Sequence, residues 1–141
     1  MMKTNLHLIL IAAGLTLTSC GGPPSRATLL VQNVWKFSEM TSSATDSANL
    51  ATVKRNKKFL VDQELRFRKD NVYTSIFPSS ADVNANSRGN WKFSAEQTQL
   101  IMAGNGNELV WNIEKLDDEF LEIKRHDQNL NAEIRFLYKK K

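Results

Sequence analysis

The sequence predicts an all-β fold, a small eight-stranded antiparallel up-and-down barrel, and three observations carry that prediction. From residue 29 onward the apolar residues recur mostly with a period of two, which is typical of strands that bury one face. Clusters of Gly, Asn, Asp or Ser interrupt this pattern every 8 to 14 residues. No long crossover separates the strands, and eight strands in succession can close on themselves, which removes exposed edges.

The segment before the strands, residues 1–19, is typical of a removable export signal. Lys3 precedes a mostly apolar run, Leu8 to Leu17, that is too short to span a bilayer. Leu17-Thr18-Ser19-Cys20 follows directly, with a branched apolar residue, two small residues and a cysteine. This arrangement resembles the lipobox of bacterial lipoproteins. An ordinary secretory signal with an incidental cysteine is the alternative.

The lipobox resemblance implies a processed and lipidated N-terminus. Cleavage would fall between Ser19 and Cys20, the Cys20 thiol would carry a diacylglycerol group, and the new amino group would be acylated with a fatty acid such as palmitate. Cys20 is the one cysteine of the chain, so no disulfide can form and its expected role is a membrane anchor. Because no Asp follows Cys20, resemblance to known sorting signals predicts the outer membrane. Because no acidic run follows the cysteine either, the same resemblance predicts its periplasmic face.

Three regions follow from this organisation: the signal peptide over 1–19, the lipidated cysteine with a flexible tether over 20–28, and the barrel domain over 29–141. The tether contains a flexible Gly-Gly pair followed by an extended Pro-Pro pair, so the domain should lie close to the membrane. The predicted strands are Val34 to Thr41, Glu64 to Lys69, Val72 to Phe77, Asn90 to Ser94, Gln99 to Ala103, Glu108 to Ile113, Phe120 to Arg125 and Asn131 to Lys139.

The connections agree with a meander of hairpins. Asp70-Asn71 suits a two-residue hairpin in which a residue takes positive φ, and residues 104–107 have the composition of a turn. Two segments break the rhythm. Residues 41–58 are polar, and three structures are possible for them. The first is a short helix near 46–57 that Asp46 caps, the second is a lid, and the third is a long loop. Residues 78–89 have no apolar periodicity and should be a surface loop.

Several short motifs, taken in order, resemble the lipocalin-like domain of small bacterial lipoproteins. They include Trp35-Lys36-Phe37, Gly89-Asn90-Trp91-Lys92-Phe93 and Trp111-Asn112-Ile113. The resemblance covers Leu29 to Tyr138. It departs from the pattern at Val34 and Asn71, where such domains commonly have Gly. It implies an eight-stranded barrel that binds a small apolar or amphiphilic molecule.

One face of the predicted strands carries most of the large apolar residues. This face is either a plain packed core or a core with a residual pocket at one open end of the barrel. The inward set includes Leu109, Ile123, Ile134 and Phe136. The candidate ligand-binding residues are Trp35, Phe37, Phe67, Tyr73, Trp91, Phe93, Trp111 and Tyr138.

Catalysis and metal binding are not expected. The one histidine of the mature chain, His126, stands beside Asp127 in a predicted turn, and no nucleophilic serine lies in a recognisable elbow. No catalytic residue, no metal ligand set and no cofactor beyond the lipid on Cys20 is therefore predicted. The acidic residues of segment 114–122 lack the spacing of a calcium loop and suit a solvated hairpin.

The distribution of charge predicts one basic surface patch and gives no case for a nucleic-acid partner. A formal net charge of +4 is too small an excess to predict nucleic-acid binding. The local basic patch could contact an anionic membrane or an acidic partner, or could protect an edge strand, while residues 139–141 suit a solvated tail. The patch consists of Lys54, Arg55, Lys57, Lys58, Arg66 and Arg68.

Two functions remain open at this point. The first is a membrane-anchored, non-catalytic domain that binds a small apolar or amphiphilic molecule in the barrel mouth. The second is a filled barrel that acts as a protein-interaction module, either as an envelope-complex subunit or as an inhibitor of a secreted enzyme. An inward aromatic residue has the same sequence signature in both.

Overall fold

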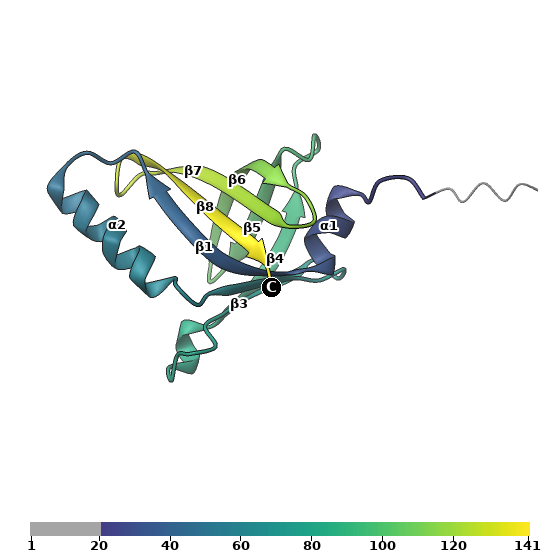
Figure 1. The fold of residues 1–141 in the computed structure, drawn as a ribbon, viewed down its shortest axis with the longest axis horizontal. Coiled ribbons are helices and arrows are strands. Elements are labelled where there is room, and N and C mark those ends of the chain that lie inside the picture. The colour runs from purple at the N-terminus through teal and green to yellow at the C-terminus, as the bar shows by residue number, and fades with distance from the viewer. Residues whose placement is uncertain (1–20) are drawn as a thin grey trace, which may run out of the picture.

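The computed structural model describes residues 21–141, so the predicted signal peptide and Cys20 lie outside the described residues. Eight antiparallel strands follow one another in sequence order and close into a barrel, which confirms the predicted fold class (Figure 1). No helix within residues 21–141 is long and apolar enough to cross a membrane. The strands are β1 (Val34–Ser42), β2 (Glu64–Phe67), β3 (Val72–Ile76), β4 (Ser87–Phe93), β5 (Gln99–Gly104), β6 (Asn107–Leu116), β7 (Phe120–Asp127) and β8 (Ala132–Lys140).

Local turn chemistry sets the register of the hairpins. Asn105 and Gly106 both take positive φ in the two-residue turn between β5 and β6, which is the geometry that suits the twist of the flanking strands. Asn71 also takes positive φ, but its turn is longer than the two residues predicted, because the Asn71 amide donates to the Arg68 carbonyl oxygen. Asp117 closes the β6–β7 turn by accepting from the amides of Glu119 and Phe120.

Helix α1 (Arg26–Gln32) lies at one end of the barrel (Figure 1), in a segment for which the sequence predicts no helix. Residues 26–28 were expected to belong to the tether, but Ser25 caps the helix by accepting a hydrogen bond from the Thr28 amide. Leu30 is fully buried, and its carbonyl oxygen accepts a 2.9 Å hydrogen bond from the indole nitrogen of Trp35. Helix α1 therefore packs against the barrel core.

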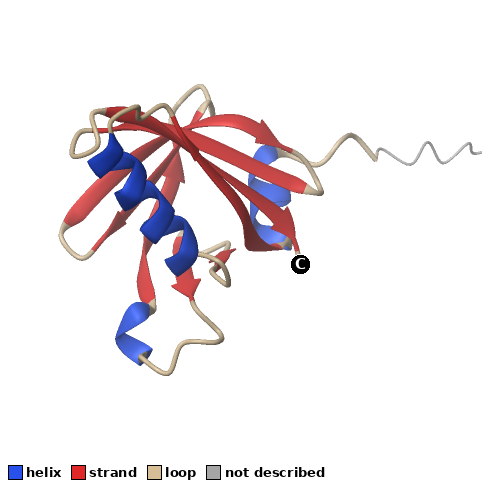
Figure 2. Ribbon diagram, turned by 60° about the vertical axis from the view of Figure 1, so that its left-hand side comes forward, coloured by secondary structure: helices blue, strands red, loops and turns tan. Residues whose placement is uncertain are grey.

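Helix α2 (Ser47–Phe59) occupies the segment for which a helix was one of three alternatives. Asp46 caps it by accepting from the Asn49 amide at 2.8 Å, and the Asn49 side chain donates to the Leu130 carbonyl oxygen at 3.0 Å. Figure 2 shows α2 lying across the strands at the end opposite α1. The β3–β4 connection forms a loop with a single short 3-10 turn, η1 (Val83–Ala85).

The C-terminal lysines are not the solvated tail that the sequence suggested. Strand β8 continues to Lys140, and the Lys141 amide donates to the Val34 carbonyl oxygen on β1. The Lys141 ammonium lies 2.6 Å from a carboxylate oxygen of Glu64 on β2, a side chain that is only 4% exposed. This ion pair joins the last residue of the chain to β2, the neighbour of β1 in the barrel.

Candidate binding site between strands β6 and β7

The eight residues predicted to line a ligand cup lie in the barrel core. Seven of them are buried, and Phe93 is partly buried against the same cluster. Seven of the eight, all except Trp35, join the neighbouring Phe136 in two groups of contacting rings, with ring centroids 5.2 to 6.3 Å apart. The groups are Phe67, Tyr73, Trp91 and Phe93, and Phe37, Trp111, Phe136 and Tyr138. An eight-stranded barrel is just wide enough for side chains to fill, and these rings do much of that filling.

The two buried tyrosines, Tyr73 and Tyr138, have different surroundings: two glycines leave space for the first, and a hydrogen bond satisfies the hydroxyl of the second. Tyr73 lies against Gly89 and Gly104, where an added Cβ would come too close to its ring or hydroxyl. The Tyr138 hydroxyl donates to Oε1 of Gln63 at 2.9 Å, and Gln63 in turn donates to the Ser75 hydroxyl at 2.8 Å. Burial raises the pKa of both tyrosines, so both remain neutral hydroxyls at physiological pH.

The barrel wall opens between β6 and β7 at the α2 end. Their paired residues run from the turn only as far as Asn112 and Lys124. Beyond that point, residues 107–111 pair with β5 and residues 125–127 pair with β8, but the two stretches do not pair with each other. A gap with an unpaired strand edge on each side is the result, and we call it the β6–β7 gap.

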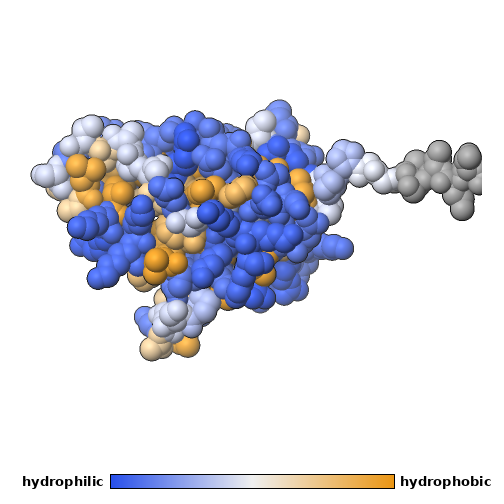
Figure 3. All heavy atoms as spheres, in the orientation of Figure 1, coloured by the Kyte–Doolittle hydropathy of each residue, from blue (hydrophilic) through white to orange (hydrophobic). Residues whose placement is uncertain are grey.

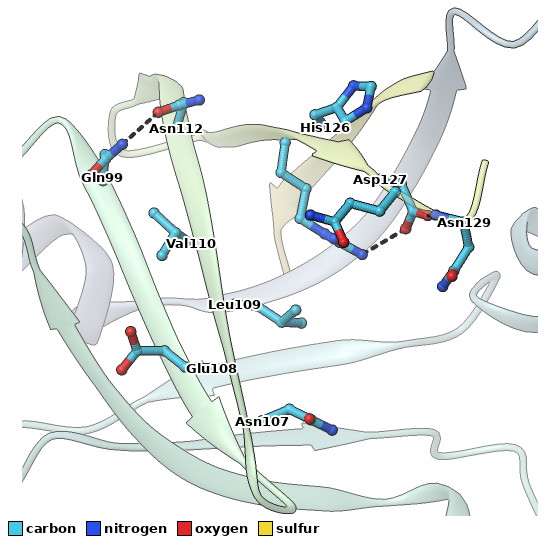
Figure 4. Close-up of a pocket in the computed structure, with 11 residues that line it drawn as sticks. Gln99, Asn107, Glu108, Leu109, Val110, Asn112, His126, Asp127 and Asn129 are labelled. Carbon is cyan, nitrogen blue, oxygen red and sulfur yellow. Dashed lines mark hydrogen bonds and ion pairs between the residues drawn. The ribbon is translucent and has the colours of Figure 1, made fainter. Parts of the chain in front are cut away.

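A groove of about 630 Å³ occupies this gap (Figure 4). On the β6 side, Leu109 and Val110 are 40% and 42% exposed, although Leu109 belongs to the inward series that continues through Trp111. Most of the remaining lining carries amide side chains. These are Gln99, Asn107, Asn112, Gln128 and Asn129.

Arg125 borders the groove from β7. It continues the inward alternation of Leu121 and Ile123, and its guanidinium carbon lies 5.0 Å from the centroid of the Trp111 ring, a cation–π geometry. One of its terminal nitrogens donates to Asp127 at 2.7 Å. Its Nε is buried without a hydrogen-bond partner, as is Nε of Arg26, the other such nitrogen within residues 21–141.

The other ionisable side chains that line the groove are Glu108, His126 and Asp127. Asp127 is engaged by Arg125 and by the amides of Asn129 and Leu130, so it closes the β7–β8 turn. His126 is exposed on the adjacent outward position. Across residues 21–141, no cluster of three or more His, Cys, Asp or Glu side chains is placed to hold a metal ion.

The predicted basic patch is divided between two elements. Arg66 and Arg68 belong to β2 and its turn, where they pair with Glu64 and Asp70. The other four cations lie on α2 and form no ion pair with any residue of 21–141. Figure 3 shows a largely hydrophilic face with scattered apolar atoms. The exposed large apolar residues on or near α2 and on η1 are Leu50, Phe59, Val61 and Val83.

The acidic residues of segment 114–122 are distributed over strands instead of converging. Glu114 pairs with Lys124 at 3.2 Å, and Glu122 pairs with Arg135 at 3.1 Å, so these carboxylates form cross-strand ion pairs on the outer face. Asp117 pairs with Lys115 at 3.1 Å, and backbone hydrogen bonds from the β6–β7 turn lower its pKa. The solvated hairpin predicted here agrees with this arrangement.

The sequence reasoning missed the β6–β7 gap and Arg125. The signal for Arg125 was available, since Leu121, Ile123 and Arg125 share one face of a strand and a cation on an inward face is unusual. The gap itself has no signal in the alternation. Comparison of the sequence with protein-family models gives no match, and comparison with curated proteins gives none either.

Proposed function

We propose that this chain is a membrane-anchored, non-catalytic lipoprotein whose filled, lipocalin-like barrel acts as a protein-interaction module of the cell envelope. The observation that carries the proposal is the contrast between a packed interior and an open wall. The predicted ligand residues pack on one another, while the β6–β7 gap leaves strand edges and aliphatic side chains exposed.

The position of the gap suits a partner approaching from the aqueous side. Lipidation at Cys20 would leave residues 21–25 between the anchor and α1, a reach of about 17 Å at most. Helix α1 and the β6–β7 turn would then face the membrane, because Asn33, which follows α1, contacts the Asp118 carbonyl oxygen in that turn. The β6–β7 gap lies toward the other end of both strands, away from the lipid surface.

A small apolar or amphiphilic ligand is the second candidate function, and the groove volume favours it. Its roughly 630 Å³ falls within the range of ordinary small-molecule pockets. Such a ligand would sit in the gap against Leu109, beside the stacked Trp111 and Arg125, instead of deep in the barrel.

Native mass spectrometry separates the two functions. The full-length chain would be purified in mild detergent from the membranes of the cells that produce it, and its native mass compared with its denatured mass. We expect a retained polypeptide and no retained small molecule. A retained small molecule would instead support the second candidate, and a bare chain would contradict a stable complex.

The anchor is tested separately. A Cys20→Ser chain should no longer incorporate labelled fatty acid and should no longer fractionate with membranes. A Ser19→Ala chain is the matched control, because alanine is also small and should preserve processing. Continued labelling of the Cys20→Ser chain would contradict the lipobox interpretation.

A further inference from the structure

We infer that the β6–β7 gap is a strand-addition site, in which a short extended segment of a partner protein pairs with the free edge of β6. The inference rests on the proposed function and names the surface and the mode of recognition. In this mode, main-chain hydrogen bonds supply affinity and alternate side chains supply specificity.

The pairing pattern identifies the main-chain groups that are available. In antiparallel pairs, consecutive residues direct their N–H and C=O groups to opposite sides. The Ile113 amide donates to the Thr98 carbonyl oxygen on the β5 side, so odd-numbered residues of this part of β6 face β5. The main-chain groups of Glu108 and Val110 therefore face the β6–β7 gap, where β7 does not pair with them.

The free edge carries few of the devices that normally prevent strand pairing. Natural edges are commonly blunted by lysine, proline or a bulge. Residues 107–111 read Asn-Glu-Leu-Val-Trp, contain neither lysine nor proline, and keep a regular register with β5. Leu109 and Val110 are exposed apolar side chains on this edge. An edge of this composition is suited to being covered by another strand.

The side chains around the gap define the segment that fits. Five residues of β6 span about 17 Å, so a segment of about five residues covers the edge. Its inward side chains would meet Leu109 beside Arg125, and the aliphatic surface of Leu109 favours apolar residues at alternate positions. Its outward side chains would lie near Glu108, which favours a lysine or arginine there.

Selection from a phage-displayed library of random octapeptides, with the full-length chain as bait, tests this directly. We expect enriched peptides to alternate apolar with polar residues and to carry a basic residue on the polar face. Val110→Pro should weaken the best peptide at least tenfold in fluorescence anisotropy, because it removes a gap-facing amide. Val110→Ala retains that amide and should change binding less than threefold. Leu109→Lys is a second blocking variant, in case the proline variant does not fold.

Hydrogen exchange provides the structural readout. Peptide binding should slow exchange of the Glu108 and Val110 amides and leave the odd-numbered neighbours unchanged. Failure to enrich any peptide, enrichment without alternation, or tight binding to both blocking variants would overturn strand addition. If the native complex from membranes survives Val110→Pro and Leu109→Lys, strand addition fails while the interaction function stands. If no partner is retained by the unmodified chain, the proposed function itself fails.

Discussion

The barrel wall separates in two places near the α2 end, and the fold covers one of them and leaves the other bare. Strand β1 pairs with β2 only over Val34–Lys36, and beyond Phe37 it pairs with β8 alone. Helix α2 lies against β1 there, and Val53 and Leu60 pack on the core. Within residues 21–141, α2 makes no comparable contacts with β6 or β7, and α1 contacts β6 from the opposite end of the barrel. The opening between β1 and β2 is therefore covered by a helix of the chain itself, whereas the β6–β7 gap is open to a segment of another protein.

The largest expected difference in the free energy of unfolding is between alanine variants of two inward residues, one beside each opening. Phe37→Ala should lower the free energy of unfolding by about 3–5 kcal/mol, because a nearly fully buried ring that contacts Phe136 and Tyr138 is replaced by a cavity. Leu109→Ala should change it by less than about 0.5 kcal/mol, because the side chain is already exposed. Urea unfolding followed by tryptophan fluorescence measures both. Equal losses would show that the bare opening is packed in solution.

Amide exchange should distinguish the two edges of β6. The amides of Leu109 and Trp111 face β5 and should be protected, whereas those of Glu108 and Val110 face the β6–β7 gap and should exchange about 100-fold faster. Exchange resolved by NMR measures this on the free chain. Protection of all four amides would mean that β6 and β7 close up or that two copies pair there.

The strand content could be predicted because it depends on local alternation. All eight strands are confirmed, and so is the predicted inward face except at Leu109, which is exposed in the β6–β7 gap. Asp46 caps a helix, as its position before Ala48 and Leu50 allowed. These features follow from residues that are near one another in sequence, so a single chain suffices to read them.

The missed features depend on relations between distant segments. Ser25 looked like part of a proline-rich tether, yet it caps α1 because Leu30 can be buried against the barrel end. Lys141 looked like a tail, yet Glu64, 77 residues away, provides its partner. The end of β6–β7 pairing depends on the twist of the closed sheet, which alternation within either strand does not encode.

Loosening α2 should affect the covered opening and not the bare one. Asp46→Ala removes the acceptor for the Asn49 amide and should destabilise the protein by about 1 kcal/mol. Amides of β1 beyond Phe37 should exchange faster, with Glu108 and Val110 unchanged. Asp82→Ala is the matched control, because it uncaps η1, whose Val83 is exposed, whereas Val53 of α2 packs against the core. An equal loss in the control would mean that α2 does not stabilise this opening.

Breaking the ion pair between Glu64 and Lys141 should also have a modest effect on stability, and its pH dependence identifies the ion pair as the cause. The Lys141 hydrogen bond is the main cause that lowers the pKa of Glu64 below its ordinary value of 4.5. A carboxylate with a lowered pKa stabilises the fold above its unfolded pKa, and this contribution is lost as the pH falls through the folded value. Lys141→Met should therefore cost about 1 kcal/mol at neutral pH, a modest value because the ammonium is half exposed.

That difference between the native chain and Lys141→Met should shrink as the pH falls below 4.5 and disappear once Glu64 is protonated in both. Urea unfolding between pH 7 and pH 2.5 measures the difference. Lys140→Met is the control, because the Lys140 side chain forms no ion pair within residues 21–141. The main-chain amide of Lys140 donates to the Glu119 carbonyl oxygen, and the substitution keeps that hydrogen bond. If Lys141→Met lowers the free energy of unfolding equally at every pH, the effect comes from packing of the aliphatic part of the lysine side chain. Strand pairing, and not the ion pair, would then hold β1 and β2 together at this point.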